Sequence, residues 1–133
     1  MQQLVLVLQK GDHLVGSLVS FCGKKNISSA WISGIGALSK ATLALYNLEN
    51  KSYSKKEIPG PLEIASLSGN VGLLNNKLVS HLHIVVSGLE LQAFGGHLDE
   101  AIVSATCEIY IQILPVQIKR SHHTEIGLNL ITS

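Results

Sequence analysis

The chain has 133 residues, enough for one domain spanning 1–133, and carries a net charge of +1. Hydrophobic residues make up 46% and charged residues 14%, against about 25% charged in a typical soluble domain, so part of the apolar surface is expected to lie between subunits. No stretch reaches the ~18 apolar residues of a membrane helix, and the near-neutral charge with a single arginine, Arg120, disfavours strong DNA binding.

The first elements predicted along the chain are a strand and a helix. Residues 4–8 form a continuous aliphatic run, which is typical of a strand covered on both faces. Asp12 is expected to cap the helix, and Gly23 to end it. The apolar positions of this helix are spaced for one buried face: Leu14, Val15, Leu18, Val19 and Cys22.

Almost everything after the helix has the pattern of β-strands. Gly34 and Gly36 indicate a bend or bulge, Pro59–Pro61 a break, and Asn75–Asn76 a turn. The predicted fold class is α/β (α+β), a single domain with a twisted, mostly antiparallel β-sheet and one main helix. Strands are expected at residues 29–33, 37–46, 53–58, 62–71, 78–87, 91–94, 101–114 and 116–119.

Three of the six histidines fall within one short span of the chain. His81 and His83 lie two residues apart on a predicted strand, so their side chains share one face. If the following loop is 88–90, His97 lies directly opposite His81, and opposed residues of an antiparallel pair share a face. One hairpin could therefore bring three imidazoles together, whereas a two-residue loop would shift the register by one.

Three histidines around an open position are typical of a catalytic zinc site. Imidazole also suits iron, nickel, cobalt and copper, so the pattern predicts a divalent metal, zinc first, on His81, His83 and His97. The alternative is that the two strand histidines are partly exposed polar residues and the third belongs to a loop.

Several residues are candidates to surround such a metal. The turn at 75–76 would place polar side chains of the preceding strand near the histidines, and two glycines would let the backbone approach them. Carboxylates could orient the ligands or act as a base, although an ordinary surface acid is the favoured interpretation of each. These candidates are Glu63, Ser66, Ser68, Asn70, Gly95, Gly96 and Glu108, with Asp99 and Glu100 as further acids.

Four stretches follow one another in a familiar order: GIGALSKATLALYN (34–47), PLEIASLSGN (61–70), HLH (81–83) and GGHL (95–98), with Thr106 and Glu108 in a late strand. Together they resemble the plant-and-prokaryote-conserved (PPC) domain family over about residues 11–128. The resemblance implies an antiparallel sheet with a helix, assembled as a homotrimer. It also implies a metal on the histidines that match His81, His83 and His97.

The resemblance leaves three functions open. In plants the domain follows AT-hook motifs that contact DNA, while the domain itself drives assembly and partner binding; this chain has no Arg-Gly-Arg-Pro hook. We expect a homotrimer with a regulatory role beside DNA-associated proteins and at most weak DNA contact. The alternatives are a metal-dependent lyase or hydrolase acting on a small molecule at the three histidines, and a metal-binding assembly module without chemistry.

Cysteine usage and the N-terminal residues indicate a compartment. Cys22 and Cys107 lie in apolar stretches without a nearby partner, which predicts buried thiols in a reducing environment. The N-terminal residues lack the charged region and cleavage signal of a secretory peptide. We therefore expect a cytoplasmic protein without membrane contact, whose scattered basic residues, Arg120 included, are solvated surface charges.

Overall fold

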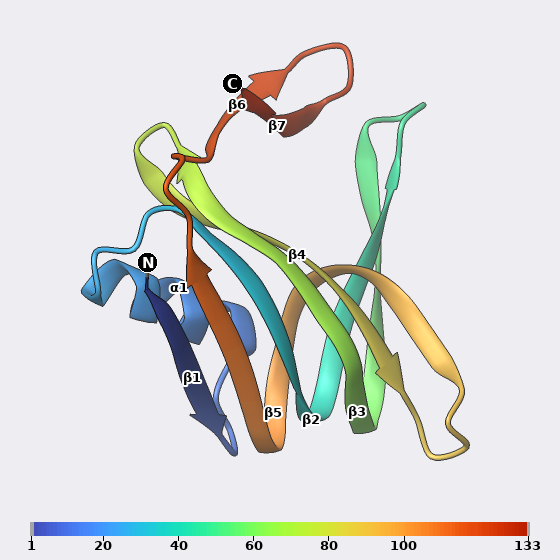
Figure 1. Cartoon of the computed structure of the whole chain (residues 1–133). Coiled ribbons are helices and arrows are strands. Elements are labelled where there is room, and N and C mark those ends of the chain that lie inside the picture. Colours follow the sequence, from blue (N-terminus) through green and yellow to red (C-terminus); the bar gives the residue numbers. More distant parts are fainter. Residues whose placement is uncertain (1, 133) are drawn as a thin grey trace.

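The computed structural model describes residues 2–132, which form one helix and seven strands (Figure 1). In chain order the elements are β1 (Gln3–Gln9), α1 (Leu14–Lys24), β2 (Ala30–Asn47), β3 (Ser52–Leu74), β4 (Lys77–Ser87), β5 (Ala93–Ile113), β6 (Lys119–His123) and β7 (Leu128–Thr132).

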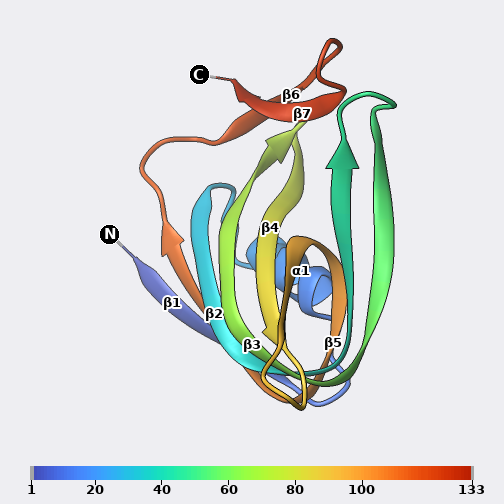
Figure 2. The ribbon, with the colours of Figure 1, turned by 90° about the vertical axis from the view of Figure 1, so that its right-hand side faces the viewer.

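The seven strands form one strongly curved sheet. Their order is β1-β5-β2-β3-β6-β7, and β4 pairs with both β3 and β5. Because β5 also pairs with β2, and β2 with β3, strands β2 to β5 close into a ring of pairings, visible as the curled sheet of Figure 2. Among the strands of residues 2–132, only the short β3–β6 pairing is parallel. The mostly antiparallel sheet with one helix that the sequence predicted is confirmed.

Helix α1 packs against β1, β4 and β5 and closes the core on one side. Leu14, Leu18 and Cys22 are completely buried, as the 3.6-residue spacing predicted. They join the inward-facing side chains of the sheet in one hydrophobic cluster. The region of residues 2–132 contains no helix with the length and apolar character needed to cross a membrane.

The prediction that Asp12 caps this helix is wrong. The N-cap residue is His13, without a side-chain hydrogen bond, and the Asp12 carboxylate accepts a hydrogen bond from the Gln9 backbone N–H instead. Glu100 of β5 takes the capping role, because its carboxylate oxygens accept hydrogen bonds from the first-turn N–H groups of Val15 (2.6 Å) and Gly16 (3.1 Å). The Glu100 carboxylate is therefore bound to the N-terminus of α1.

Long, bent strands replace several pairs of shorter predicted ones. β2 is continuous, with the predicted bulge between Gly34 and Gly36 and a second between Leu38 and Lys40. Pro59–Pro61 does not interrupt β3, because it lies opposite the second bulge, where the ladder of hydrogen bonds is broken and a missing N–H leaves no partner unsatisfied.

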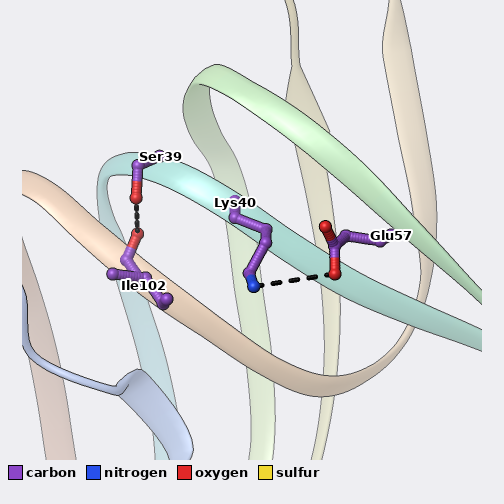
Figure 3. A network of polar contacts seen from close by, with 4 residues as sticks. All are labelled: Ser39, Lys40, Glu57 and Ile102. Atoms are coloured by element: carbon purple, nitrogen blue, oxygen red, sulfur yellow. Dashed lines mark hydrogen bonds and ion pairs between the residues drawn. The ribbon is translucent and has the colours of Figure 1, made fainter.

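Side chains bridge the second bulge of β2 to both neighbouring strands. The hydroxyl of Ser39 donates a hydrogen bond to the carbonyl oxygen of Ile102 on β5, at 3.4 Å (Figure 3). Lys40 forms an ion pair with Glu57 on β3, at 3.6 Å. Such an exposed pair contributes only up to about 1 kcal/mol, so the bulge is defined mainly by the backbone.

The end of the chain also differs from the expected strand at 116–119. β5 ends at Ile113, just before the predicted break at Pro115, residues 114–118 connect the elements, and β6 and β7 then form a hairpin. Figures 1 and 2 show this hairpin lying across the end of the sheet. The β5 segment predicted as two strands, 91–94 and 101–114, is one strand of 21 residues.

Candidate metal centre

The hairpin β4–β5 places the three predicted histidines together. His83, rather than His81, lies directly opposite His97, so the predicted register is wrong by two residues. Side chains alternate between faces with a period of two, so a shift of two residues changes the partner but keeps the face. All three imidazoles therefore lie on the same side of the sheet.

The register differs because the connecting loop is longer than expected. Ser87 pairs with Ala93, which leaves five residues, 88–92, in the loop. Gln92 closes it: its backbone oxygen accepts a hydrogen bond from the Gly88 N–H (3.1 Å), and its side-chain oxygen accepts one from the Glu90 N–H (3.0 Å).

The three imidazoles converge with a geometry that fits a metal ion. The ring centroids are 5.2 Å apart for His81–His83, 5.5 Å for His81–His97 and 5.8 Å for His83–His97. One nitrogen of each ring lies within 4.8 Å of the others. Tetrahedral zinc with Zn–N bonds of ~2.0–2.1 Å separates its ligand nitrogens by roughly 3.4 Å, so small side-chain rotations would complete the site.

The protonation states of the two half-buried histidines, His81 and His97, also suit a metal. Burial, the positive charge of Arg120 and the two other histidines lower the pKa of His81 to about 4. Burial and His83 lower the pKa of His97, although the nearby Asp99 carboxylate opposes this shift. Neutral imidazole has the lone pair that a metal requires. Moreover, the buried Nδ1 of His97 has no hydrogen-bond partner within residues 2–132, as expected of a group that awaits another ligand.

Arg120 of β6 lies beside this cluster and is not the solvated surface charge that the sequence predicted. Its Nη2 donates a hydrogen bond to Oδ1 of Asn70 (2.8 Å) and lies 3.4 Å from Nδ1 of His81. Its Nη1 donates to the backbone oxygen of Asn129 (3.1 Å). The parallel pairing of β6 with the end of β3 brings Arg120 here, and no local sequence pattern announces that long-range pairing.

A pocket of about 350 Å³ opens next to the histidines. Tyr53, which no sequence pattern indicated as a site residue, forms part of its wall, and its ring centroid lies 5.0 Å from that of His97. The hairpin β6–β7 covers another side, held by a hydrogen bond from the Tyr46 hydroxyl to the Ile126 carbonyl (2.6 Å). The lining residues are Tyr53, Leu74, Val79, Ser80, His81, His97, Arg120, Gly127, Leu128, Asn129 and Leu130.

Of the three polar residues predicted on β3, two lie beside the histidines and one does not. Asn70 lies directly opposite His81, and Ser68 directly opposite His83. Ser66 is one step further along β3, opposite Val85, and lines a different groove.

The predicted carboxylates stay away from the pocket. Glu63 is exposed and pairs with Ser87 at the far end of β4. Glu108 lines the second groove, beside Ile35 of β2. Asp99 forms an ion pair with Lys55, at 3.0 Å. No acid lines the pocket among the residues that the structure describes.

The glycines before His97 allow the neighbouring strands to approach β5 closely. A Cβ at Gly96 would lie 3.0 Å from the backbone oxygen of Ala44 on β2, and one at Gly95 would lie 3.4 Å from that of Ile84 on β4. Gly96 thus lets β5 pass closely between two strands just before His97. The sequence predicted instead that the glycines let the backbone approach the metal site.

Comparison with known proteins identifies close relatives of this chain. A metal-containing protein from Archaeoglobus fulgidus is 36% identical, with a TM-score of 0.93 over 100% of this chain and 94% of that one. A protein from Bacteroides thetaiotaomicron, provisionally named as DNA-binding, is 32% identical, with a TM-score of 0.94 over 98% and 91%. A plant- and prokaryote-conserved protein from Pyrococcus horikoshii is 29% identical, with a TM-score of 0.92 over 100% and 92%.

No curated protein compared with the chain matches it. The family model for the Plants and Prokaryotes Conserved (PCC) domain matches residues 1–115, which include all three histidines but not Arg120. This match covers most of the sequence, and the resemblance recognised in the sequence is confirmed. The chain belongs to the Plants and Prokaryotes Conserved domain family.

Proposed function

We propose that this chain is a homotrimeric metal-binding protein that holds one divalent metal ion, zinc, on His81, His83 and His97. The observation that carries the proposal is the approach of three imidazole nitrogens to within 4.8 Å of one another. The lowered pKa of His81 and His97 supports it, because a protonated imidazole cannot bind a metal. A related protein from Archaeoglobus fulgidus is named as metal-containing.

Zinc titration of the chelator-treated protein tests this proposal. We expect saturation at one zinc per chain, measured by calorimetry and by elemental analysis after removal of excess metal. Cobalt should substitute and give the visible spectrum of a tetrahedral ion, since geometry rather than affinity order distinguishes such sites. A protein that retains no zinc after gel filtration would contradict the proposal.

An apolar face on the outside of the sheet supports the homotrimer. Strand pairing sets Val5 beside Tyr110, and Val7 and Ile35 on either side of Glu108. Exposed apolar side chains gathered on one face of a sheet, here around Glu108, are typical of a subunit interface. The exposed side chains of this face, named here the outer β face, are Val5 (60%), Val7 (55%), Trp31 (47%), Ile35 (56%) and Tyr110 (42%).

A second candidate function is that of a metal-dependent lyase or hydrolase. The pocket beside the histidines favours it, because a site for assembly alone has no need of a 350 Å³ cavity at the metal ligands. Zinc would supply a Lewis acid there. Of the protein's own groups, Tyr53 and Arg120 are placed to contact a small molecule in the pocket.

The proposed role near DNA is regulatory and does not depend on direct binding. Relatives that are provisionally named as DNA-binding suggest an association with DNA. In this chain, however, the only arginine lies in the pocket and the net charge is +1, so few phosphates could be neutralised.

We therefore expect weak binding to duplex DNA that disappears at moderate salt. Fluorescence anisotropy with an AT-rich duplex should give a dissociation constant above about 1 μM at ~150 mM salt, well outside the 10⁻⁸–10⁻¹¹ M range of specific binders. A submicromolar constant at that salt concentration would overturn the expectation.

A further inference from the structure

We propose that the pocket beside the three histidines binds a small organic carboxylate, and that Arg120 is the residue that recognises the carboxylate group. The inference deepens the proposed metal site, on which it rests for its functional meaning: the anion would be the molecule presented to the metal. Three features of the pocket carry it, namely an uncompensated charge, the placement of the guanidinium, and the apolar walls.

The positive charge of Arg120 has no acidic partner within the described residues. The ion pairs found there join Lys40 to Glu57 and Lys55 to Asp99, and neither reaches Arg120. No aspartate or glutamate lines the pocket. A half-buried cation without a counter-ion attracts an anion from solution, and a divalent metal on the histidines would strengthen that attraction.

The guanidinium is held in place and yet is short of acceptors. Asn70, on one side, and the backbone of Asn129, on the other, fix it beside His81. Arginine has five N–H groups, and the buried Nε has no hydrogen-bond partner in residues 2–132. Because that atom is shielded from the pocket, an incoming carboxylate would meet Nη1 and Nη2, whose contacts to Asn129, Asn70 and His81 use at most three of their four N–H groups.

The remaining walls select an organic anion over an inorganic one. Leu74, Val79, Leu128 and Leu130 give the pocket apolar sides, and Tyr53 adds an aromatic ring next to His97. A pocket of about 350 Å³ is at the lower end of the ~300–1,000 Å³ typical of small-molecule sites. A short carbon chain that ends in one carboxylate fits the guanidinium, the apolar walls and the volume of this pocket.

Binding of butyrate, with butyramide as the neutral molecule of the same shape, tests the inference. Titrations followed by calorimetry are made on metal-free and zinc-loaded protein. We expect butyrate to bind at least about tenfold more tightly than butyramide, because hydrogen bonds to a charged group contribute about 1.5–3 kcal/mol. Equal binding of the two compounds, or no binding of butyrate, would overturn the proposal without the need for any variant.

The residue is tested with Arg120→Gln, Arg120→Lys and the control Lys119→Gln. Lys119 is the exposed neighbour on the same strand, so its replacement removes the same charge outside the pocket. Arg120→Gln should weaken butyrate binding at least about tenfold, Arg120→Lys should keep part of it, and Lys119→Gln should leave it unchanged. Wild-type affinity in Arg120→Gln, with its fold verified by circular dichroism, would show that Arg120 does not hold the carboxylate.

Zinc content measured in the same samples separates this inference from the proposed function. If the wild-type chain takes up no zinc, the metal site fails, and the comparison of butyrate with butyramide on the metal-free protein still decides the role of Arg120. If zinc binds normally in Arg120→Gln and butyrate binding is unchanged, the carboxylate pocket alone fails.

Discussion

Replacing His83 with alanine is expected to abolish zinc binding while leaving the chain folded. Only two ligand nitrogens would remain. Loss of a residue that only hydrogen-bonds to a metal ligand already lowers metal affinity by about 10- to 100-fold. We therefore expect zinc affinity to fall by more than ~100-fold. Competition with a chromophoric chelator measures this loss.

The fold should tolerate this change because His83 contributes nothing to the core. Its side chain is exposed, while its neighbours on β4, Leu82 and Ile84, are 1% and 2% exposed and face the opposite side. Exposed substitutions of this kind usually alter the free energy of unfolding by less than about 0.5 kcal/mol. Thermal unfolding followed by circular dichroism should therefore give nearly the wild-type transition for the metal-free protein.

His13→Ala is the matched control for this experiment. His13 is exposed and is the N-cap residue of α1, and its side chain makes no capping hydrogen bond. Its replacement removes one imidazole from the chain and none from the cluster, so zinc binding should match that of the wild type. If His83→Ala keeps wild-type zinc affinity, the ligand set must be different.

Local chemistry made most of the sheet and the histidine cluster predictable. The helix follows from its apolar spacing, the bulge from Gly34 and Gly36, and the turn from Asn75–Asn76, whose φ angles of 51° and 63° are of the kind that asparagine tolerates. The predicted register was wrong by two residues, but the prediction of the cluster still holds, because only a shift by an odd number of residues would place His97 on the other face.

What the sequence did not predict depends on pairings between distant segments. Glu100 caps a helix 84 residues away, and Arg120 reaches His81 through a parallel pairing at the end of β3. Local patterns indicate that a residue is polar or charged but do not state its partner. The pocket was missed for the same reason, because Tyr53 and the β6–β7 hairpin are far apart in the sequence and meet only in the folded chain, beside the histidines.

The outer β face leads to the second large effect: Ile35→Glu is expected to convert a trimer into a monomer. Light scattering of the wild-type protein should give about three times the chain mass of 14.3 kDa. Ile35 is 56% exposed and lies beside Glu108, so a second carboxylate would add repulsion within the face and bury an unpaired charge in the interface. Removing an unpaired charge from water costs several kcal/mol, and this cost would recur at each of the three interfaces of the trimer.

Leu48→Glu is the matched control, since Leu48 is 62% exposed in the turn between β2 and β3, away from the outer β face. It introduces the same charge at similar exposure, and the mass should remain that of the trimer. Both variants should keep the wild-type circular dichroism spectrum, because neither residue belongs to the core cluster. A wild-type protein that is monomeric at micromolar concentration, or an Ile35→Glu variant that stays trimeric, would show that this face is not the interface.

Zinc binding measured on the monomeric variant then reveals whether assembly is needed for the metal site. We expect that it is not, because all three ligands come from one hairpin of a single chain.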